Sequence, residues 1–312
     1  PAWGSGYFTI NAAGNVVVHK PASWTPLTAY RFAELALKAG LPPGALNVVT
    51  GPGSTAGSAL VAHPEVDKVS FTGETTTGKQ IMRDAAASMK RVSLELGGKS
   101  PNIVFADAPD LDTAAGFAAR GFCTNQGQIC WAGSRLFVER AIHARFVEKL
   151  VERVRADWRI GDPMQASTSM GPVISGTHRD RVEEFIAAGR NEGAEMVLGG
   201  KRPDREGFFV RPTVFDNASN RMKIAREEIF GPVLTVIPFT DVDDLVAQAN
   251  DTCYGLVAGL WTTDLTRAHR LARLLRAGSI WINTYGPQSA AAPFGGVKQS
   301  GMGRELGQEV LQ

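Results

Sequence analysis

The stretch Leu46-Asn47-Val48-Val49-Thr50-Gly51-Pro52-Gly53-Ser54-Thr55-Ala56-Gly57 places an apolar run directly before a glycine-rich turn. The run at 46–50 has the length and the valine content of a strand, and the turn at 51–57 is typical of the point where a strand passes into a helix. A strand-turn-helix unit of this kind predicts a parallel sheet covered by helices. The GxGxxxG pattern alone is weak evidence for a nucleotide, because a tight turn without a ligand shows the same pattern.

The segments on either side of this unit continue the same rhythm. The expected elements are a short buried strand at 16–19, a helix from about Thr28 to Ala39 that ends at Gly40, a strand at 68–71, the turn Thr72-Gly73-Glu74 and a helix to about Met89. Their β-α-β-α-β order predicts parallel strands joined by right-handed crossovers.

The alternation restarts after Glu95, which predicts a second α/β domain. Its expected strands are 102–105, 135–138, 196–198, 232–238, 256–261 and 279–283. Its expected helices are 111–122, 142–158, 178–190, 242–250 and a last one from the N-cap Asp264 to Ala277, with Gly278 at the C′ position. We therefore expect an α/β protein of two lobes with parallel-type sheets and a cleft between the lobes.

The composition limits the function further. The 312 residues, 44% hydrophobic and 21% charged, are typical of a soluble globular protein with room for two domains. A net charge of +2 without a long basic run argues against nucleic-acid binding. The odd number of scattered cysteines indicates a reducing compartment, and no apolar run reaches the roughly 20 residues of a membrane helix, so we expect a cytoplasmic protein. No histidine or cysteine pair has metal-ligand spacing, which predicts no metal.

Cys130 ends the polar, glycine-containing run Asn125-Gln126-Gly127-Gln128-Ile129 and precedes the bulky Trp131. This context suits attack from one side, so we interpret Cys130 as a nucleophile. A thiol has a pKa of about 8.5, so the role requires nearby donors that favour the thiolate. The alternative is a buried structural cysteine, which is the commoner environment of this residue type.

Glu95 places one carboxylate inside an apolar strand that ends at Gly97-Gly98. A carboxylate at such a position is costly to bury unless it is paired or has a chemical role. Glu95 is therefore a candidate general base. The alternative is an ion-paired strand residue, with Arg91 or Lys99 as its partner.

Six segments, in this order along the chain, resemble the aldehyde dehydrogenase superfamily. They are KPASWTP (20–26), FTGETTTG (71–78), LELGGKSP (94–101), NQGQICWAGS (125–134), EEIFGP (227–232) and PFGGVKQSG (293–301). The resemblance implies that residues 1–97 are the remainder of a Rossmann-like NAD(P)-binding domain, 98–299 a catalytic thiol domain and 300–312 a C-terminal return segment. It also implies a homo-oligomer, and a chain that lacks the N-terminal part and the last residues of the family.

The resemblance further implies oxidation of a small-molecule aldehyde to a carboxylic acid, with hydride transfer to NAD or NADP. The residue matching Cys130 forms a thiohemiacetal and then a thioester, and the residue matching Glu95 activates the water that hydrolyses it. The positions matching cofactor contacts are Lys20, Ser23, Gly73, Glu74, Gly78, Glu228 and Phe230. The positions expected to line the substrate mouth are Ile129, Trp131, Asn283 and Phe294. Because a catalytic asparagine of the family falls in the missing part, we expect the chain alone to be a weak catalyst.

Several alternatives stay open. Ser23 stands where NAD-preferring relatives carry a glutamate, which favours the use of NADP. Glu74 stands where a serine is common, and it either shifts the pyrophosphate or simply caps the following helix. The alternative to a cofactor contact at Glu228 is a solvated surface carboxylate. Two other functions are a cysteine-dependent ester or acyl hydrolase built on Cys130 and Glu95, and a non-catalytic truncated relic.

Overall fold

The computed structural model describes residues 14–308, so the outer ends of the first and last predicted domains, residues 1–13 and 309–312, lie outside it. The chain divides into two compact units. Unit 1 contains the described residues up to Glu95 together with Gln288–Gly295 and those from Gly301 onward, and unit 2 contains Leu96–Pro287 and Gly296–Ser300. The segment Gln288–Gly295, which we expected in the catalytic domain, thus belongs to unit 1.

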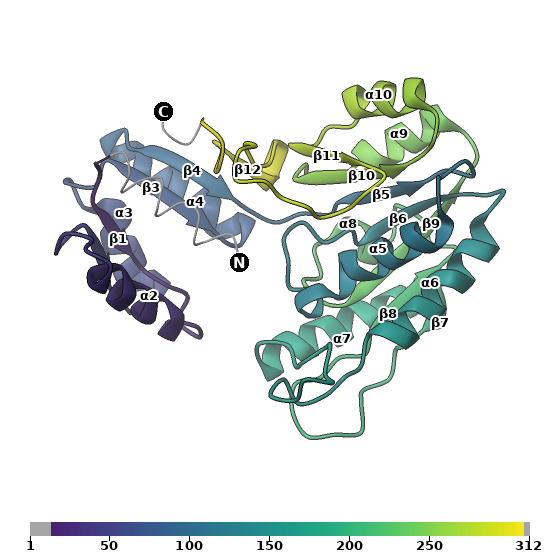
Figure 1. The fold of residues 1–312 in the computed structure, drawn as a ribbon, viewed down its shortest axis with the longest axis horizontal. Helices are drawn as coiled ribbons and strands as arrows, with labels where there is room; N and C mark the ends of the chain where they lie inside the picture. The colour runs from purple at the N-terminus through teal and green to yellow at the C-terminus, as the bar shows by residue number, and fades with distance from the viewer. Residues whose placement is uncertain (1–13, 309–312) are drawn as a thin grey trace. The chain divides into compact units, whose positions relative to one another are not determined.

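Unit 1 holds two small sheets, drawn largely in purple and blue in Figure 1. One pairs β1 (Val17–His19) with β2 (Leu46–Val48) in parallel, and the other has the order β12 (Gly301–Met302), β4 (Arg91–Glu95), β3 (Lys68–Thr72). β3 and β4 are parallel, whereas β12 is antiparallel to β4. The helices are α2 (Leu27–Lys38), α3 (Ser58–Ala62) and α4 (Thr75–Ala85).

The first strand was expected to be buried at 16–19, and its burial differs from this expectation. It forms as β1, but only Val17 is buried, since Val16 and Val18 are 66% and 44% exposed. The glycine-rich turn after β2 was expected to open a helix, and it does so through one π-helical turn, Gly53–Gly57, that leads directly into α3.

Unit 2 is built on one seven-stranded sheet. Its order is β11 (Ser279–Ile282), β10 (Val257–Trp261), β5 (Pro101–Val104), β6 (Arg135–Glu139), β9 (Val233–Phe239), β8 (Thr213–Asp216), β7 (Glu195–Leu198). All neighbouring strands are parallel except β7 and β8. The α/β fold class with parallel-type sheets is therefore confirmed, although β8 and β12 were not expected from the sequence.

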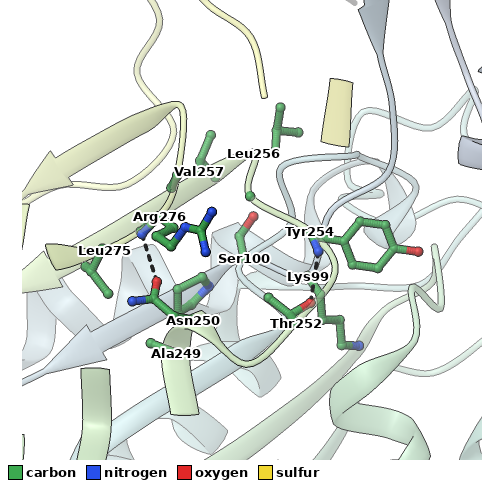
Figure 2. A pocket seen from close by; sticks show the side chains of 14 residues that line it. Lys99, Ser100, Ala249, Asn250, Thr252, Tyr254, Leu256, Val257, Leu275 and Arg276 are labelled. Atoms are coloured by element: carbon green, nitrogen blue, oxygen red, sulfur yellow. Dashed lines mark hydrogen bonds between the residues drawn. The ribbon is translucent and has the colours of Figure 1, made fainter. Parts of the chain in front are cut away.

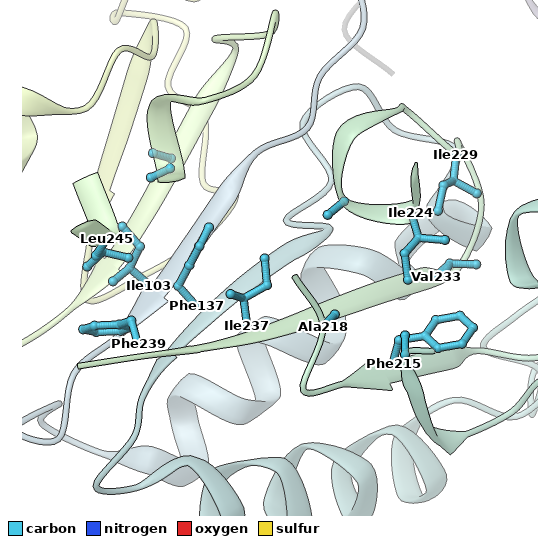
Figure 3. Close-up of a cluster of buried hydrophobic side chains, with 14 of the residues drawn as sticks. Ile103, Phe137, Phe215, Ala218, Ile224, Ile229, Val233, Ile237, Phe239 and Leu245 are labelled. Carbon is cyan, nitrogen blue, oxygen red and sulfur yellow. The ribbon is translucent and has the colours of Figure 1, made fainter. Parts of the chain in front are cut away.

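Helices cover both faces of this sheet (Figure 1). α5 (Leu111–Cys123) and α6 (His143–Asp157) pack on one face, where Phe146, Leu150 and Val154 of α6 are buried. The other face packs against α7 (Gly176–Asn191), α8 (Lys223–Arg226), α9 (Val242–Asn250) and α10 (Leu265–Leu274). Figure 3 shows part of this second core, with Phe137 and Ile237 side by side on neighbouring strands. No helix in the described part of the chain is long and apolar enough to cross a membrane.

The predicted end of α10 is wrong. The helix begins after the N-cap Asp264 as expected but ends at Leu274 rather than Ala277. The Asn250 side chain accepts from the Arg276 backbone N–H at 2.8 Å and donates to the Leu274 carbonyl at 2.9 Å. These bonds, with the burial of Leu275, replace the last helical turn.

Candidate functional site

Cys130 follows a loop whose backbone is unusual. Three successive residues, Asn125, Gln126 and Gly127, have φ of 50°, 58° and 71°, in the left-handed region that non-glycine residues rarely adopt. Asn125 and Gln128 brace the loop, since the Asn125 amide donates to the Gln128 carbonyl and the Gln128 N–H donates to the Asn125 carbonyl, both at 3.0 Å. The segment before the thiol is thus held in a strained conformation of the kind that clusters at functional sites.

The same loop lies against the EEIFGP segment. A β-carbon added to Gly127 would lie 2.2 Å from the carbonyl oxygen of Gly231, so only glycine permits this approach. Phe230, just before Gly231, also has a positive φ of 56° and a partly exposed side chain. Two segments about a hundred residues apart in the sequence therefore meet through backbone contact.

Gly97 and Gly98 of the LELGGKSP segment contact both of these segments. A β-carbon added to Gly98 would lie 2.2 Å from the Cys130 carbonyl oxygen. The Gly98 N–H donates to the Glu228 carboxylate at 3.1 Å, and a β-carbon on Gly97 would lie 2.2 Å from the same carboxylate. Glu228 is thus half-buried over the glycine pair, which argues against a purely solvated surface role.

Lys99, next to this glycine pair, is fully buried, and its ammonium has no hydrogen-bond partner among the described residues. Burial and, to a smaller extent, the neighbouring Arg135 lower the pKa of Lys99 against the opposing effect of Glu228 and Glu227, and the resulting pKa is about 7. Figure 2 shows Lys99 and Tyr254 among the side chains that line a cavity of about 10 Å³, the space of roughly one water molecule. Cys130 does not line this cavity, so it is not a substrate pocket.

Glu95 lies in unit 1, at the end of β4, and is 4% exposed. Neither of its carboxylate oxygens has a hydrogen-bond partner in the described part of the chain, which does not support the ion-paired alternative. Burial and, to a smaller extent, the nearby Glu305 carboxylate raise the pKa of Glu95 against the opposing effect of Arg304, and the resulting pKa is about 8. A β-carbon on Gly295 would lie 2.7 Å from the Glu95 carboxylate, so the PFGG segment meets LELGG here.

Most cofactor positions predicted from the sequence lie in unit 1. The Lys20 ammonium donates to the carbonyls of Pro21 at 2.8 Å and Gly51 at 3.4 Å, and its side chain runs beside Gly57. Lys20 and the glycine-rich turn are therefore brought together. Ser23 is exposed in the turn before α2.

The segment around Gly73 leads into α4. Gly73 lies close to the Phe71 ring, and Gly78 is buried within the helix. Glu74 occupies the N-cap position of α4 as the capping alternative required, but its side chain makes no capping hydrogen bond. Glu228 and Phe230, the two remaining cofactor positions, lie in unit 2.

The four substrate-mouth positions differ in their surroundings. Ile129 and Trp131 flank Cys130 and are partly exposed, whereas Phe294 is buried in unit 1. The Asn283 amide pairs with the Thr262 backbone, accepting from its N–H at 2.9 Å and donating to its carbonyl at 3.0 Å. The role of all four at a substrate mouth stays a prediction.

Sequence reasoning did not find two residues that contact these sites. Glu305 acts on Glu95 through tertiary proximity, and Tyr285 contacts the segment that follows Cys130. Neither lies in a segment where the local pattern signals such a role. Within residues 14–308, no group of three or more histidine, cysteine, aspartate or glutamate side chains could hold a metal ion.

Comparison with known proteins extends the resemblance noted above. The model of the aldehyde dehydrogenase family matches residues 8–312. The chain is 50% identical over 299 residues to cytosolic aldehyde dehydrogenase 1 of Rattus norvegicus and 48% identical over 305 residues to betaine aldehyde dehydrogenase of Bacillus subtilis. These alignments cover 96% of this chain in both cases, and 59% and 62% of the relatives.

Solved structures agree with these matches. An indole-3-acetaldehyde dehydrogenase in complex with NAD+ matches with a TM-score of 0.94 at 49% identity, and the aldehyde dehydrogenase KauB from Pseudomonas aeruginosa with 0.95 at 50%. Each comparison covers 97% of this chain and 62% of the solved chain. The chain therefore spans less than two thirds of the length of these relatives. Because the family model matches nearly all of its residues and the relatives share about half of them, the chain belongs to the aldehyde dehydrogenase family.

Proposed function

We propose that this chain carries the nucleophile, the general base and the nicotinamide contacts for NAD(P)-dependent oxidation of an aldehyde to a carboxylic acid. The observation that supports this most directly is the meeting of three distant segments around Cys130. Gly98 contacts its carbonyl, Glu228 accepts from the Gly98 N–H, and Gly231 contacts the loop that precedes it. Such close backbone packing preorganises a nucleophile next to a carboxylate that can hold a cofactor.

The residues present fit a nicotinamide dinucleotide. Lys20 offers a partly buried cation beside the glycine-rich turn, where it can hold the hydroxyls of the adenosine ribose. Glu228 is half-buried and accepts from the Gly98 N–H, and because a carboxylate can accept from several donors it can also hold the hydroxyls of the other ribose. A nicotinamide bound there supplies an acceptor for the hydride that leaves the substrate carbon.

Cys130 begins the reaction as its thiolate, which adds to the aldehyde carbonyl and forms a carbon–sulfur bond. The carbonyl electron pair moves to oxygen, where the backbone N–H of Cys130 can donate to the oxyanion. Loss of hydride from that carbon re-forms the carbonyl and leaves a thioester on Cys130. Sulfur suits both steps, because it adds reversibly and its thioester is reactive enough to hydrolyse.

Glu95 completes the cycle as the general base. In its ionised form it takes a proton from water while the water oxygen attacks the thioester, and the Cys130 thiolate leaves with the acid as co-product. A buried carboxylate with a pKa of about 8 is a strong enough base for this transfer near neutral pH. The overall balance is one aldehyde, one water and one oxidised cofactor consumed for one acid, one reduced cofactor and one proton.

Three cysteine variants test the assignment. Cys130→Ala is expected to abolish aldehyde oxidation and ester hydrolysis together, whereas Cys123→Ala and Cys253→Ala leave both near wild type. Cys123 is fully buried, and burial raises the pKa of its thiol well above the usual range, so it stays protonated. Retained turnover in Cys130→Ala would remove the nucleophile from the proposal.

The same assays separate the rival functions. A cysteine acyl hydrolase would turn over esters but reduce neither NAD nor NADP with any of a panel of aliphatic, aromatic and semialdehyde substrates. Cofactor binding without covalent labelling of Cys130 would select a non-catalytic relic.

A further inference from the structure

Tyr285 lies shortly after β11 in unit 2 and is 3% exposed. Its ring fills a slot lined by three glycines from different parts of the unit: Gly121 in α5, Gly133 after Cys130 and Gly259 in β10. A β-carbon added to these glycines would lie 3.4 Å, 2.9 Å and 2.5 Å from the nearest atoms of the Tyr285 side chain. The slot exists in this form only because each of these positions lacks a side chain.

The hydroxyl at the end of this slot contacts the nucleophile segment. It donates to the carbonyl oxygen of Trp131, the residue after Cys130, at 2.8 Å. The segment is tied at two further points, because the Ala132 N–H donates to the Ile129 carbonyl and the Gly133 N–H to the Gly121 carbonyl, both at 3.1 Å. The Tyr285 bond adds a side-chain contribution to this turn, and it acts within one residue of the thiol.

Aromatic packing fixes the ring in the slot. The Trp281 ring lies 4.9 Å from the Tyr285 ring and 6.3 Å from the Trp131 ring, and Trp131 lies 6.4 Å from Tyr285. Because the ring is confined by glycine backbone on one side and by indoles on another, the hydroxyl has little freedom to leave the Trp131 carbonyl. Burial raises the pKa of Tyr285 above its usual range, and the nearby Cys130 raises it further, so the hydroxyl keeps its proton and stays a donor.

We propose that Tyr285 is a positioning residue for Cys130: its hydroxyl fixes the Trp131 carbonyl and thereby the direction of the Cys130 side chain and backbone N–H. This inference rests on the proposed function, in which Cys130 is the nucleophile and its N–H faces the oxyanion. It assigns a role in the chemistry to a residue outside the segments that carry the family resemblance. If Tyr285 served only to fill its slot, the ring alone would be sufficient and the hydroxyl dispensable.

Tyr285→Phe separates these two roles, because it keeps the ring and removes one hydrogen bond. We expect kcat for aldehyde oxidation to fall about tenfold, the size of one neutral hydrogen bond, with an unchanged KM for the cofactor and a thermal unfolding temperature near wild type. The pH profile of Cys130 alkylation by iodoacetamide is expected to change as well, because the thiol is held differently. Tyr30→Phe is the matched control, since it also removes one hydroxyl bond, from Tyr30 to Thr50, away from Cys130.

Gly259→Ala tests the slot from its far side. The added methyl group would push the Tyr285 ring from β10 without contacting the Cys130 segment directly, so we expect the same kinetic change as in Tyr285→Phe. Wild-type kcat and alkylation profile in Tyr285→Phe would overturn the proposal. The alkylation assay requires no cofactor or aldehyde, so it tests the positioning role even if the wild-type chain fails to oxidise aldehydes, an outcome that would count against the proposed function alone.

Discussion

Gly98 lies directly against Cys130, and a β-carbon at position 98 would lie 2.2 Å from the Cys130 carbonyl oxygen. The contact is between two backbones, so no flexible side chain can move aside. Gly98, three residues after the end of β4, therefore limits where the Cys130 segment can lie, although the two residues are 32 apart in the numbering.

Gly98→Ala is expected to displace Cys130 and lower kcat for aldehyde oxidation by about a hundredfold, the usual effect of a shift of about 1 Å at a reacting group. Gly116→Ala is the matched control, because Gly116 lies in α5 and an added methyl group meets nothing within 4 Å. We expect Gly116→Ala to keep full activity. Equal activity of the two variants would show that the Gly98 contact does not position the thiol.

Glu95→Gln is expected to leave acyl-enzyme formation intact and slow its hydrolysis, because the amide fills the same space but cannot take a proton from water. The expected trace is a burst of reduced cofactor followed by a stalled steady state. Equal loss of burst and steady state would instead give Glu95 a role in thiol activation or in folding.

The pH dependence of deacylation gives a separate test of the Glu95 environment. The base acts when ionised, so in wild type the rate is expected to rise through a midpoint at about pH 8. Glu305→Gln removes a neighbouring negative charge and is expected to move this midpoint to lower pH. Arg304→Met removes the opposing positive charge and is expected to move it to higher pH. Shifts in the same direction would show that these charges do not act on Glu95.

Elements whose signal lies in their own sequence could be predicted. The predicted helix 142–158 begins one residue before α6, the capping residue Asp264 placed the start of α10 correctly, and the glycine-rich turn at 51–57 indicated the passage from a strand into a helix. The pattern around Cys130 indicated a nucleophile, and this stays a prediction. β12 could not be found in the same way, because it has two residues and exists only through its pairing with β4.

The same limit applies to the candidate site. Nothing around Tyr285 in the sequence indicates that three glycines at distant positions leave a slot for its ring. The end of α10 depends on the Asn250 side chain from another helix, and the raised pKa of Glu95 depends on burial and on Glu305. Each is a tertiary effect, and local propensity carries no information about it.

Cofactor preference can be tested at Ser23, which is exposed three residues after Lys20. A carboxylate about 4 Å from a 2′-phosphate costs about 4 kcal/mol at an effective dielectric of 20, whereas a serine hydroxyl can donate to the phosphate. Ser23→Glu is therefore expected to raise the KM for NADP at least tenfold more than that for NAD. Thr25→Glu, in the same exposed turn, is the control for added charge. Equal changes in both constants for Ser23→Glu would show that Ser23 does not face the ribose.

The lowered pKa of the buried Lys99 predicts an unusual pH dependence of the free energy of unfolding. Its pKa is about 7 in the folded chain and 10.5 in the unfolded chain, so between these values the unfolded state binds a proton that the folded state has released. The free energy of unfolding contributed by Lys99 therefore rises with pH over this range, and the cost of burying its charge is fully present below pH 7.

Lys99→Met removes the charge with little change in shape. The variant is expected to be more stable than wild type below pH 7, by on the order of a few kcal/mol, and to lose this advantage towards about pH 10. Urea unfolding of both proteins at the two ends of this range measures the difference, with Lys201→Met, which removes an exposed ammonium, as the control. An advantage of Lys99→Met that is the same at both ends would mean that Lys99 binds the same number of protons in the folded and the unfolded chain over this range, and that burial does not lower its pKa.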